Sequence, residues 1–359
     1  MNIRVTYRHE YLRRIRVGYI GCGGHSYRNV LPTFAYCPID LVATCDLDAD
    51  KARAFARQFG AERFYADYRE MLTQEALDAV FIVTGYDRQT RKPLYPPLAM
   101  DAMQAGCHVW MEKPPAASAD EIRAMMAVSE QTKKFVMVGF KKCFFPAIEK
   151  VKDLIGREEF GHVGTIYVRY PQSIPLPEQM RRYEPPAVGF LDHIVHPASI
   201  LVYLMGDIQS VFYERSPNGS GSALLKFANG ATGVLHLTAG QSGTSPLERL
   251  EVTGSGANVV VDNGIKLTYY RPGARGAYGR SSHYFGADEQ APIYWEPEFS
   301  LGQLYNQGIF LLGYWGEVYH FAECVLNDRP PRRCDLRHAL EVMKLYEAFK
   351  QPPGMVITL

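Results

Sequence analysis

The chain has 359 residues, of which 47% are hydrophobic and 21% charged, and its formal net charge is +1. This length favours two globular domains with sizeable cores. The near-neutral charge excludes a general attraction to nucleic acid or to acidic membranes. No uninterrupted apolar run approaches the ~20 residues that span a bilayer. The charged N-terminal segment lacks the apolar core of a secretory signal.

The seven cysteines are scattered along the chain and include no C-x-x-C pair. This pattern argues against a disulfide framework and against a zinc site, so we expect no metal ligands. Cys22, Cys45 and Cys107 lie in apolar, strand-like runs, where a reduced thiol packs as a small hydrophobic side chain. We therefore expect a reduced, cytoplasmic protein with no nucleic-acid or membrane partner.

From residue 15 to about 140, apolar runs alternate with amphipathic segments, which predicts a parallel sheet joined by crossover helices. The predicted strands are Ile15–Ile20, Leu41–Cys45, Arg63–Tyr65, Ala79–Thr84, His108–Met111 and Phe135–Gly139. The predicted helices are Ala49–Phe59, Leu98–Gln104 and Ala119–Thr132. Ser118 and Glu121 are placed to form a capping box at the start of the last of these helices.

The pattern changes after about residue 141. A short helix, Ala147–Ile155, leads to strand-like runs at close intervals: Thr165–Tyr170, Val211–Glu214, Ala223–Phe227, Thr232–Leu237, Glu248–Thr253, Asn258–Val261 and Lys266–Tyr270. Asn229-Gly230 and Asn263-Gly264 are hairpin signals, so this sheet should be mainly antiparallel. The stretch 271–308 reads as a long loop or insertion, and helices over Gly316–Leu326 and Asp335–Phe349 follow. We predict domains at 15–140 and 141–359, with the last helices able to pack back on the first.

A glycine-rich turn follows the first predicted strand. Its sequence is Gly21-Cys22-Gly23-Gly24-His25-Ser26, and a helical segment comes next. In this setting glycines permit a tight turn and bring pyrophosphate close to backbone N–H groups at a helix N-terminus. Ser26 stands where the dinucleotide fingerprint has its third glycine, and its hydroxyl can bond a phosphate. We expect Gly21, Gly23, Gly24, His25 and Ser26 to contact the cofactor.

Asp46 ends the next predicted strand. A carboxylate there can accept hydrogen bonds from the ribose hydroxyls of NAD, and it would repel the 2′-phosphate of NADP. No arginine follows it at once to receive that phosphate, so NAD is expected rather than NADP. The alternative is that Asp46 only caps the helix that begins near Asp48.

Glu112-Lys113-Pro114 closes the strand His108–Met111. Ligands of open α/β sheets bind outside the carboxyl ends of the strands, so a lysine at this point should stand over a bound nucleotide. We expect both Glu112 and Lys113 to contact the cofactor. Taken alone, a Lys-Pro pair is also typical of an ordinary strand-end turn. Thr84 and Gly85, after the fourth strand, should line the same nucleotide.

Asp192 and His196 lie four residues apart, ahead of the apolar run Ile200–Met205. In a helix they face the same side, where the carboxylate orients the imidazole and stabilises its protonated form. His196 can then accept the proton of a substrate hydroxyl that Lys113 holds. The alternative is a helix N-terminus with Asp192 compensating the dipole and His196 in a core. His193 faces another side.

The glycine turn, Glu112-Lys113-Pro114 with Gly106-x-His108-Val109, and the Asp192-x-x-x-His196 pair resemble the Gfo/Idh/MocA oxidoreductases. The resemblance runs from about residue 15 to about 350. This family includes glucose–fructose oxidoreductase and inositol dehydrogenase. The resemblance implies a Rossmann domain and a C-terminal α/β domain with a large open sheet that commonly serves oligomerisation, here as a homodimer or homotetramer. It also implies Lys113, Asp192 and His196 as the catalytic group, with His196 as general base.

The chain departs from the family pattern after the fourth strand. Thr84-Gly85-Tyr86 replaces the usual Thr-Pro-Asn, and a basic stretch of about six residues, 87–92, follows. Tyr95 stands where family members often carry a histidine. These differences put the local contacts to the nucleotide, and the rim of the site, in doubt.

Substrate clues come from two segments. The loop Tyr170–Val188 carries Arg181, Arg182 and Tyr183, and the later insertion carries Arg271, Arg275, Tyr278, Arg280 and His283. Such side chains suit a carbohydrate or polyol, although they are also common on solvated loops.

We therefore expect an NAD-dependent dehydrogenase or reductase acting on a secondary alcohol or ketone of a sugar, inositol or sugar derivative. A redox-neutral NAD-dependent glycosidase, with tightly held NAD, would use the same Lys113 and His196. A third reading, a regulator that binds NAD and sugar without turnover, is disfavoured by the intact catalytic set.

Overall fold

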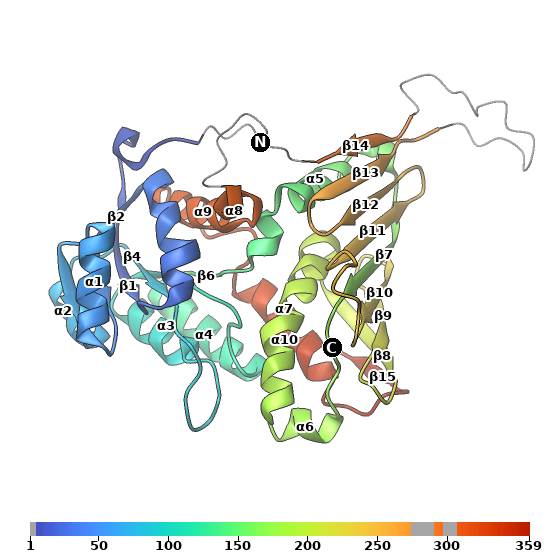
Figure 1. Cartoon of the computed structure of the whole chain (residues 1–359), viewed down its shortest axis with the longest axis horizontal. Helices are drawn as coiled ribbons and strands as arrows, with labels where there is room; N and C mark the ends of the chain where they lie inside the picture. Colours follow the sequence, from blue (N-terminus) through green and yellow to red (C-terminus); the bar gives the residue numbers. More distant parts are fainter. Residues whose placement is uncertain (1–4, 274–290, 297–306) are drawn as a thin grey trace, which may run out of the picture. The chain divides into compact units, whose positions relative to one another are not determined.

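The computed structural model describes residues 5–273, 291–296 and 307–359. The chain forms two compact units, the first made of residues 1–144 and 305–344 and the second of residues 145–304 and 345–359. A six-stranded sheet belongs to the first unit and a nine-stranded sheet to the second (Figure 1). The predicted fold class, a parallel sheet domain followed by a domain with a large and mainly antiparallel sheet, is confirmed.

The strands of the first sheet are all parallel, in the order β3-β2-β1-β4-β5-β6. They are β1 Ile15–Ile20, β2 Ile39–Cys45, β3 Arg63–Tyr65, β4 Ala79–Ile82, β5 His108–Met111 and β6 Val136–Val138. Each agrees with its predicted strand apart from small shifts at the ends. The order reverses between β1 and β4, and such a switch point opens a crevice at the carboxyl ends of the strands.

The first unit contains η1 Arg8–Glu10, η2 Ser26–Val30, η3 Leu31–Tyr36, α1 Ala49–Phe59, α2 Tyr68–Gln74, α3 Tyr95–Gln104, α4 Ala119–Thr132, η4 Lys141–Phe144, α8 Gln307–Leu311 and α9 Tyr314–Leu326. The predicted bounds of α1 and α4 are confirmed. The segment after the glycine turn is a π-turn, η2, followed by a 3₁₀ stretch, η3, in which Pro32 lacks the N–H that a regular helix would use. Sequence analysis missed α2 because Met71 is its single buried residue, too little for a periodic signal.

Side-chain caps fix the starts of two of these helices. Asp48 accepts hydrogen bonds from the backbone N–H groups of Asp50 and Lys51 at the start of α1. Ser118 accepts one from Glu121 N at 3.3 Å at the start of α4. The Glu121 carboxylate accepts from Ala117 N, one residue before the position that the predicted capping box requires.

Aromatic side chains build the core of the first unit around Phe81 of β4. Trp110 of β5 stacks on it with ring centroids 5.1 Å apart, and Phe321 of α9 packs edge-on at 5.3 Å. Since Phe321 is completely buried, α9 is part of the core of the parallel-sheet unit although it comes from near the end of the chain.

The second sheet has the order β14-β13-β12-β11-β7-β10-β9-β8-β15, and only the β7–β10 pair is parallel. The strands are β7 Val163–Tyr170, β8 Ile208–Arg215, β9 Gly221–Phe227, β10 Thr232–Leu237, β11 Arg249–Gly254, β12 Asn258–Asp262, β13 Lys266–Tyr270, β14 Ile293–Trp295 and β15 Val356–Thr358. Both predicted hairpins are confirmed: β9 pairs with β10 across Gly230, and β12 pairs with β13 across Asn263 and Gly264, all three at positive φ.

One predicted loop contains a strand. Ile293–Trp295 lies inside the stretch 271–308 and pairs with β13 as β14. Three residues are too few to show an alternating pattern, so pairing rather than local sequence defines this strand. The candidate substrate residues Arg275, Tyr278, Arg280 and His283 lie outside the described residues.

The second unit also contains α5 Pro146–Ile155, η5 Glu158–Phe160, α6 Pro177–Arg181 and α7 Pro185–Met205, while α10 Leu336–Ala348 runs across the boundary of the two units. By length and composition α7 is long and apolar enough to cross a membrane, but 67% of its apolar window is buried inside the protein, as in the core helix of a globular fold. Asp192, His193 and His196 interrupt the apolar pattern, so the sequence shows no continuous run.

Candidate active site

A hollow of about 630 Å³ lies at the carboxyl ends of β1, β2 and β4 in the first unit. This is the crevice expected where the strand order reverses. Five of the predicted cofactor residues line it: Gly21, Gly23, Asp46, Thr84 and Gly85. The other lining residues that bear on binding are Leu47, Asp67, Tyr68, Arg69, Leu94, Pro97 and Leu98. Gly24, His25, Ser26, Glu112 and Lys113 are not among the residues that line this hollow.

The two glycines that line this hollow have different physical roles. Gly21 has φ +102°, and a Cβ added there would lie 2.0 Å from the carbonyl oxygen of Val83. A Cβ at Gly23 would meet no atom within 4 Å. Gly21 therefore lets β1 turn sharply against β4, whereas Gly23 leaves open space where a ligand can approach the backbone.

We expect Gly21→Ala and Gly23→Ala to separate these roles. The clash and the strained backbone should cost Gly21→Ala on the order of 2–4 kcal/mol of unfolding free energy. Gly23→Ala should keep the stability of the wild type and bind NADH more weakly, because its methyl group occupies the open space. Denaturant unfolding and fluorescence titration with NADH check both variants. Equal losses of stability would show that Gly23 is not a cradle for a ligand.

Asp46 joins the glycine turn to the end of β2. Its Oδ2 accepts a hydrogen bond from Cys22 N at 2.8 Å, and its Oδ1 accepts one from Asp48 N at 3.0 Å. The helix α1 is capped by Asp48 itself, so the alternative that Asp46 is only a helix cap is wrong. Each carboxylate oxygen keeps a lone pair for a further donor, such as a ribose hydroxyl.

Ser26 does not take the role that the sequence suggested. It is completely buried, and its hydroxyl donates to the carbonyl oxygen of Gly21 at 2.6 Å. The π-turn of η2 directs the side chain inward, where it holds the turn together instead of meeting a phosphate. The third glycine of the dinucleotide fingerprint allows helix and strand to pack closely. Here a serine takes that position, and its hydrogen bond to Gly21 links the two ends of the turn.

Thr84 lines the hollow and carries a buried polar atom without a partner in the described part of the chain. Its hydroxyl oxygen is buried and has no hydrogen-bond partner among the described residues. Its carbonyl oxygen accepts a hydrogen bond from the Tyr95 hydroxyl at 2.6 Å. Tyr95 therefore holds the backbone of Thr84 in place. A buried polar group without a partner is costly unless a ligand supplies one. The open space at Gly23, the Thr84 hydroxyl and the Asp46 carboxylate together fit a dinucleotide.

Arg69 is a charged residue of the hollow that sequence analysis missed. Its guanidinium lies over the Tyr68 ring, 4.6 Å from the centroid, and pairs with Asp101 at 3.2 Å. Arg69 does not follow Asp46 directly in the sequence and comes instead from α2, a helix that was not predicted.

Glu112 connects the glycine turn to the end of β5. The His25 imidazole Nε2 lies 2.8 Å from Glu112 Oε1, and Lys113 N donates to Glu112 Oε2 at 3.0 Å. Glu112 itself is buried, while His25 and Lys113 are half-buried. The buried carboxylate thereby fixes the backbone from which the Lys113 side chain extends. His25 thus contacts Glu112, the residue that holds the backbone of Lys113.

In the second unit, Asp192 and His196 lie on α7, and the predicted helix is confirmed. Since α7 begins at Pro185, Asp192 lies beyond its first turn, too far along to compensate the helix dipole. Both side chains are half-buried on one face of the helix, and His193 is exposed.

Tyr170, the last residue of β7, completes the surroundings of this pair. Its ring centroid lies 6.4 Å from that of His196. Burial raises the pKa of Tyr170 well above its ordinary value, and the charges of Glu248 and Asp192 raise it further. Tyr170 therefore stays protonated and can donate a hydrogen bond. No motif in the sequence marks Tyr170, because it lies at the end of an ordinary strand pattern.

The arginines proposed as substrate contacts have other partners. Arg181 of α6 donates to the carbonyl oxygen of Lys350 at 2.7 Å, and Arg182 lies 3.9 Å from the Glu184 carboxylate. Both are exposed. Arg271 donates to the carbonyl oxygen of Ala291 at 2.6 Å.

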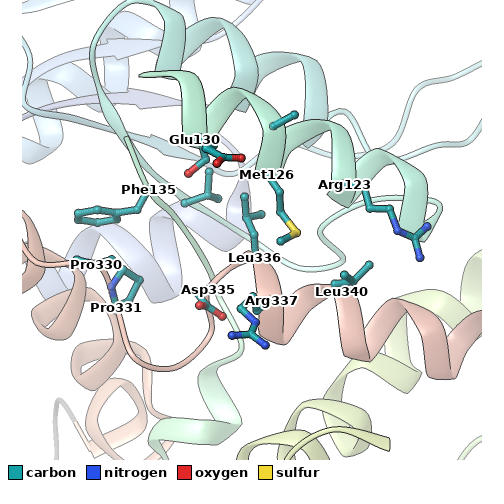
Figure 2. Close-up of a pocket in the computed structure, with 13 residues that line it drawn as sticks. Arg123, Met126, Glu130, Phe135, Pro330, Pro331, Asp335, Leu336, Arg337 and Leu340 are labelled. Carbon is teal, nitrogen blue, oxygen red and sulfur yellow. The ribbon is translucent and has the colours of Figure 1, made fainter. Parts of the chain in front are cut away.

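A second hollow of the first unit lies between α4 and the segment 330–340, and Figure 2 shows Met126, Leu336 and Leu340 there with Arg123 and Arg337. It contains none of the predicted site residues. It does not lie at the carboxyl ends of the strands where the glycine turn and Asp46 meet, and we assign it no role in cofactor binding.

Two consecutive parts of the chain are similar to a known family of proteins. The model described as "Oxidoreductase family, NAD-binding Rossmann fold" (GFO_IDH_MocA) matches residues 15–140, and the GFO/IDH/MocA C-terminal domain matches residues 148–260. The myo-inositol 2-dehydrogenase of Thermotoga maritima is 24% identical over 269 residues, which are 71% of this chain and 78% of that protein. The D-apiose dehydrogenase of Paraburkholderia graminis is 37% identical over 143 residues, 39% of this chain and 36% of that protein.

A solved structure shares the fold of nearly the whole chain. It is an oxidoreductase from Agrobacterium radiobacter in complex with NAD+, L-tartaric acid and magnesium, with a TM-score of 0.76 at 17% identity, covering 96% of this chain and 98% of that one. The two family models match consecutive parts of the chain, and their architecture is the one described above. The protein therefore belongs to the Gfo/Idh/MocA family of oxidoreductases, with an NAD-binding Rossmann domain and the C-terminal domain of that family.

Proposed function

We propose that the protein is an NAD-dependent oxidoreductase that transfers a hydride between nicotinamide and a secondary alcohol or ketone of a sugar, polyol or sugar derivative. The observation that carries this proposal is the Asp46 carboxylate, held between the glycine turn and β2 at the edge of the hollow. The pair of Asp192 and His196 on one face of α7 supplies the acid–base groups that such a reaction needs.

In this proposal the bound nicotinamide supplies the hydride acceptor or donor, and the side chains handle the substrate oxygen and its proton. Lys113 donates a hydrogen bond to the substrate oxygen and stabilises negative charge that develops on it. His196 takes up the hydroxyl proton during oxidation and returns it during reduction, with Asp192 orienting the ring. Tyr170 lies beside the ring and can donate a hydrogen bond to a substrate oxygen.

The substrate class is supported by the relatives. The matched proteins from Thermotoga maritima and Paraburkholderia graminis are named for myo-inositol and D-apiose. Both molecules are rich in hydroxyl groups, and oxidation of one carbinol carbon needs the proton and hydride handling described above. A polyol or sugar is therefore the class that we propose for this chain.

We expect Asp46→Ala to weaken NADH binding about ten- to hundredfold, because hydrogen bonds to a charged group contribute about 1.5–3 kcal/mol. NADPH binding should change less, since the variant also removes the repulsion of the 2′-phosphate. Isothermal titration with both nucleotides measures the two effects. The exposed Asp50 of α1 supplies the control variant Asp50→Ala. Equal losses for NADH and NADPH would contradict the role of Asp46.

The proposed function is tested first by denaturing freshly purified protein and quantifying the released nucleotides. An empty protein that binds NADH far better than NADPH supports a dehydrogenase with an exchangeable cofactor. One equivalent of retained NAD would instead favour the redox-neutral glycosidase, in which the cofactor is recycled in place. Retained NADP would contradict the proposed cofactor.

A further inference from the structure

Three potential metal ligands meet in the first unit, away from the residues that line the cofactor hollow. They are Cys143 of η4, Cys334 just before α10, and His338 in the first turn of α10. Their ligand atoms all lie within 4.8 Å of one another, and all three residues are buried. The two cysteines are far apart in the sequence. They form no C-x-x-C motif, so the sequence alone does not indicate a metal site.

The backbone holds this cluster at the edge of the parallel sheet. Val138 N, at the end of β6, donates to the carbonyl oxygen of Cys334 at 2.7 Å. Cys334 has φ +60°, a left-handed conformation that is unfavourable for a side chain with a Cβ. Such a conformation persists only where the surroundings impose it, and it is often found at functional sites.

The hydrogen bonding of His338 leaves a lone pair on one of its ring nitrogens. Cys334 N donates to His338 Nδ1 at 3.2 Å. This contact selects the tautomer in which Nδ1 carries a lone pair, the form of imidazole that ligates metals. A bound ion would take the place of the backbone N–H as partner of Nδ1.

Helix α9, which packs against η4, carries a buried acid. A Cβ added at Gly316 of α9 would lie 3.3 Å from Phe144 Cβ. Glu317 of α9 is completely buried, and neither of its carboxylate oxygens has a hydrogen-bond partner among the described residues. It is not one of the residues whose ligand atoms lie within 4.8 Å of one another, so we do not count it among the ligands.

Two cations flank the cluster. Arg333 Nη1 donates to the carbonyl oxygen of Cys143 at 3.0 Å, and its guanidinium lies over the Phe144 ring. Lys141 Nζ lies 2.8 Å from the Tyr314 hydroxyl, and its charge acts on Glu317. Two thiolates would balance the charge of a divalent ion, and the neighbouring cations stabilise the thiolate form of the two cysteines.

We propose that Cys143, Cys334 and His338 bind a Zn²⁺ ion. Two sulfurs and one imidazole nitrogen are donors that zinc accepts. Zinc binding displaces the two thiol protons to solvent. Because all three ligands are buried, we infer a structural site that links η4 to the start of α10.

The full-length chain, freed of any affinity tag, tests this proposal by elemental analysis. Protein grown with added zinc should retain about one zinc per chain after gel filtration. Removal by a strong chelator should lower the melting temperature, and added Zn²⁺ should restore it. A protein that neither retains zinc nor gains stability from added Zn²⁺ overturns the proposal. So does a disulfide between Cys143 and Cys334, found by mass spectrometry in protein that never binds zinc.

Variants separate the ligands from other buried cysteines. His338→Gln should weaken Zn²⁺ affinity at least tenfold in a competition titration with a chromophoric chelator. Cys334→Ser should lose the zinc, whereas Cys324→Ser, at a buried cysteine outside the cluster, should keep it. If Cys334→Ser does not fold, the comparison of His338→Gln with the wild type still tests the site. Zinc bound equally well by the wild type and His338→Gln contradicts the proposed ligand set.

Discussion

Replacing Lys113 by methionine should lower kcat by about 10²- to 10⁴-fold, the range typical of a positioned proton-transfer or charge-stabilising group. Methionine preserves much of the length of the side chain but cannot donate a hydrogen bond to the substrate oxygen. The backbone of Lys113 is held by Glu112, so the variant should fold normally. The NADH dissociation constant should change by no more than a few-fold. Steady-state kinetics with the identified substrate and fluorescence titration with NADH give the two values.

The exposed Lys266 of β13 provides the control variant, Lys266→Met, which should keep the wild-type rate. An unchanged rate in Lys113→Met would remove the lysine from the mechanism. A collapse of NADH binding with a proportionate loss of rate would make Lys113 a nucleotide contact instead. The two measurements together thus distinguish the three roles that a strand-end lysine can have here.

Replacing His196 by asparagine should lower kcat/KM by about 10²- to 10⁴-fold, because the general base is lost. The pH profile of the rate should change as well, because the group that accepts the proton is lost. Asp192→Asn should give a smaller loss, since it removes the partner that orients the ring and leaves the base in place. The measurement is kcat/KM as a function of pH between about pH 5 and pH 8, the range in which an unperturbed imidazole changes charge.

His193 offers a matched control on the same helix. It is exposed and lies off the face shared by Asp192 and His196. His193→Asn should therefore keep both the rate and its pH profile. Similar losses in His193→Asn and His196→Asn would mean that α7 itself is disturbed and that neither residue is a specific base.

Much of the cofactor hollow could be predicted because its residues follow a local pattern. Gly21 and Gly23 come straight after a strand, and Asp46 ends the next one, so the parallel sheet brings them together. The prediction failed where a side chain depends on an irregular turn. Ser26 lies in a π-turn that directs its hydroxyl inward, and no sequence rule distinguishes that turn from an ordinary helix start.

Helical spacing predicts which residues of α7 share a face, but it does not predict which residues of other elements pack beside them. Spacing alone places Asp192 and His196 on one face, as the structure confirms. Tyr170 reaches the same place from β7, and only the packing of a helix on a sheet brings it there. The zinc site that we propose is an extreme case, since its cysteines belong to η4 and to the residue before α10. Contacts of such long sequence separation leave no local signal.

The central claim is that this chain oxidises or reduces a carbinol carbon with NAD at a site that includes Lys113. The most direct measurement follows absorbance at 340 nm while the protein is incubated with NAD+ or NADP+ and a panel of polyols and sugars, myo-inositol and D-apiose among them. We predict that at least one compound yields NADH and the corresponding ketone in equal amounts, faster with NAD+ than with NADP+, and that Lys113→Met abolishes the reaction. Cleavage of a glycoside without net NADH, or a full rate in Lys113→Met, would contradict the account.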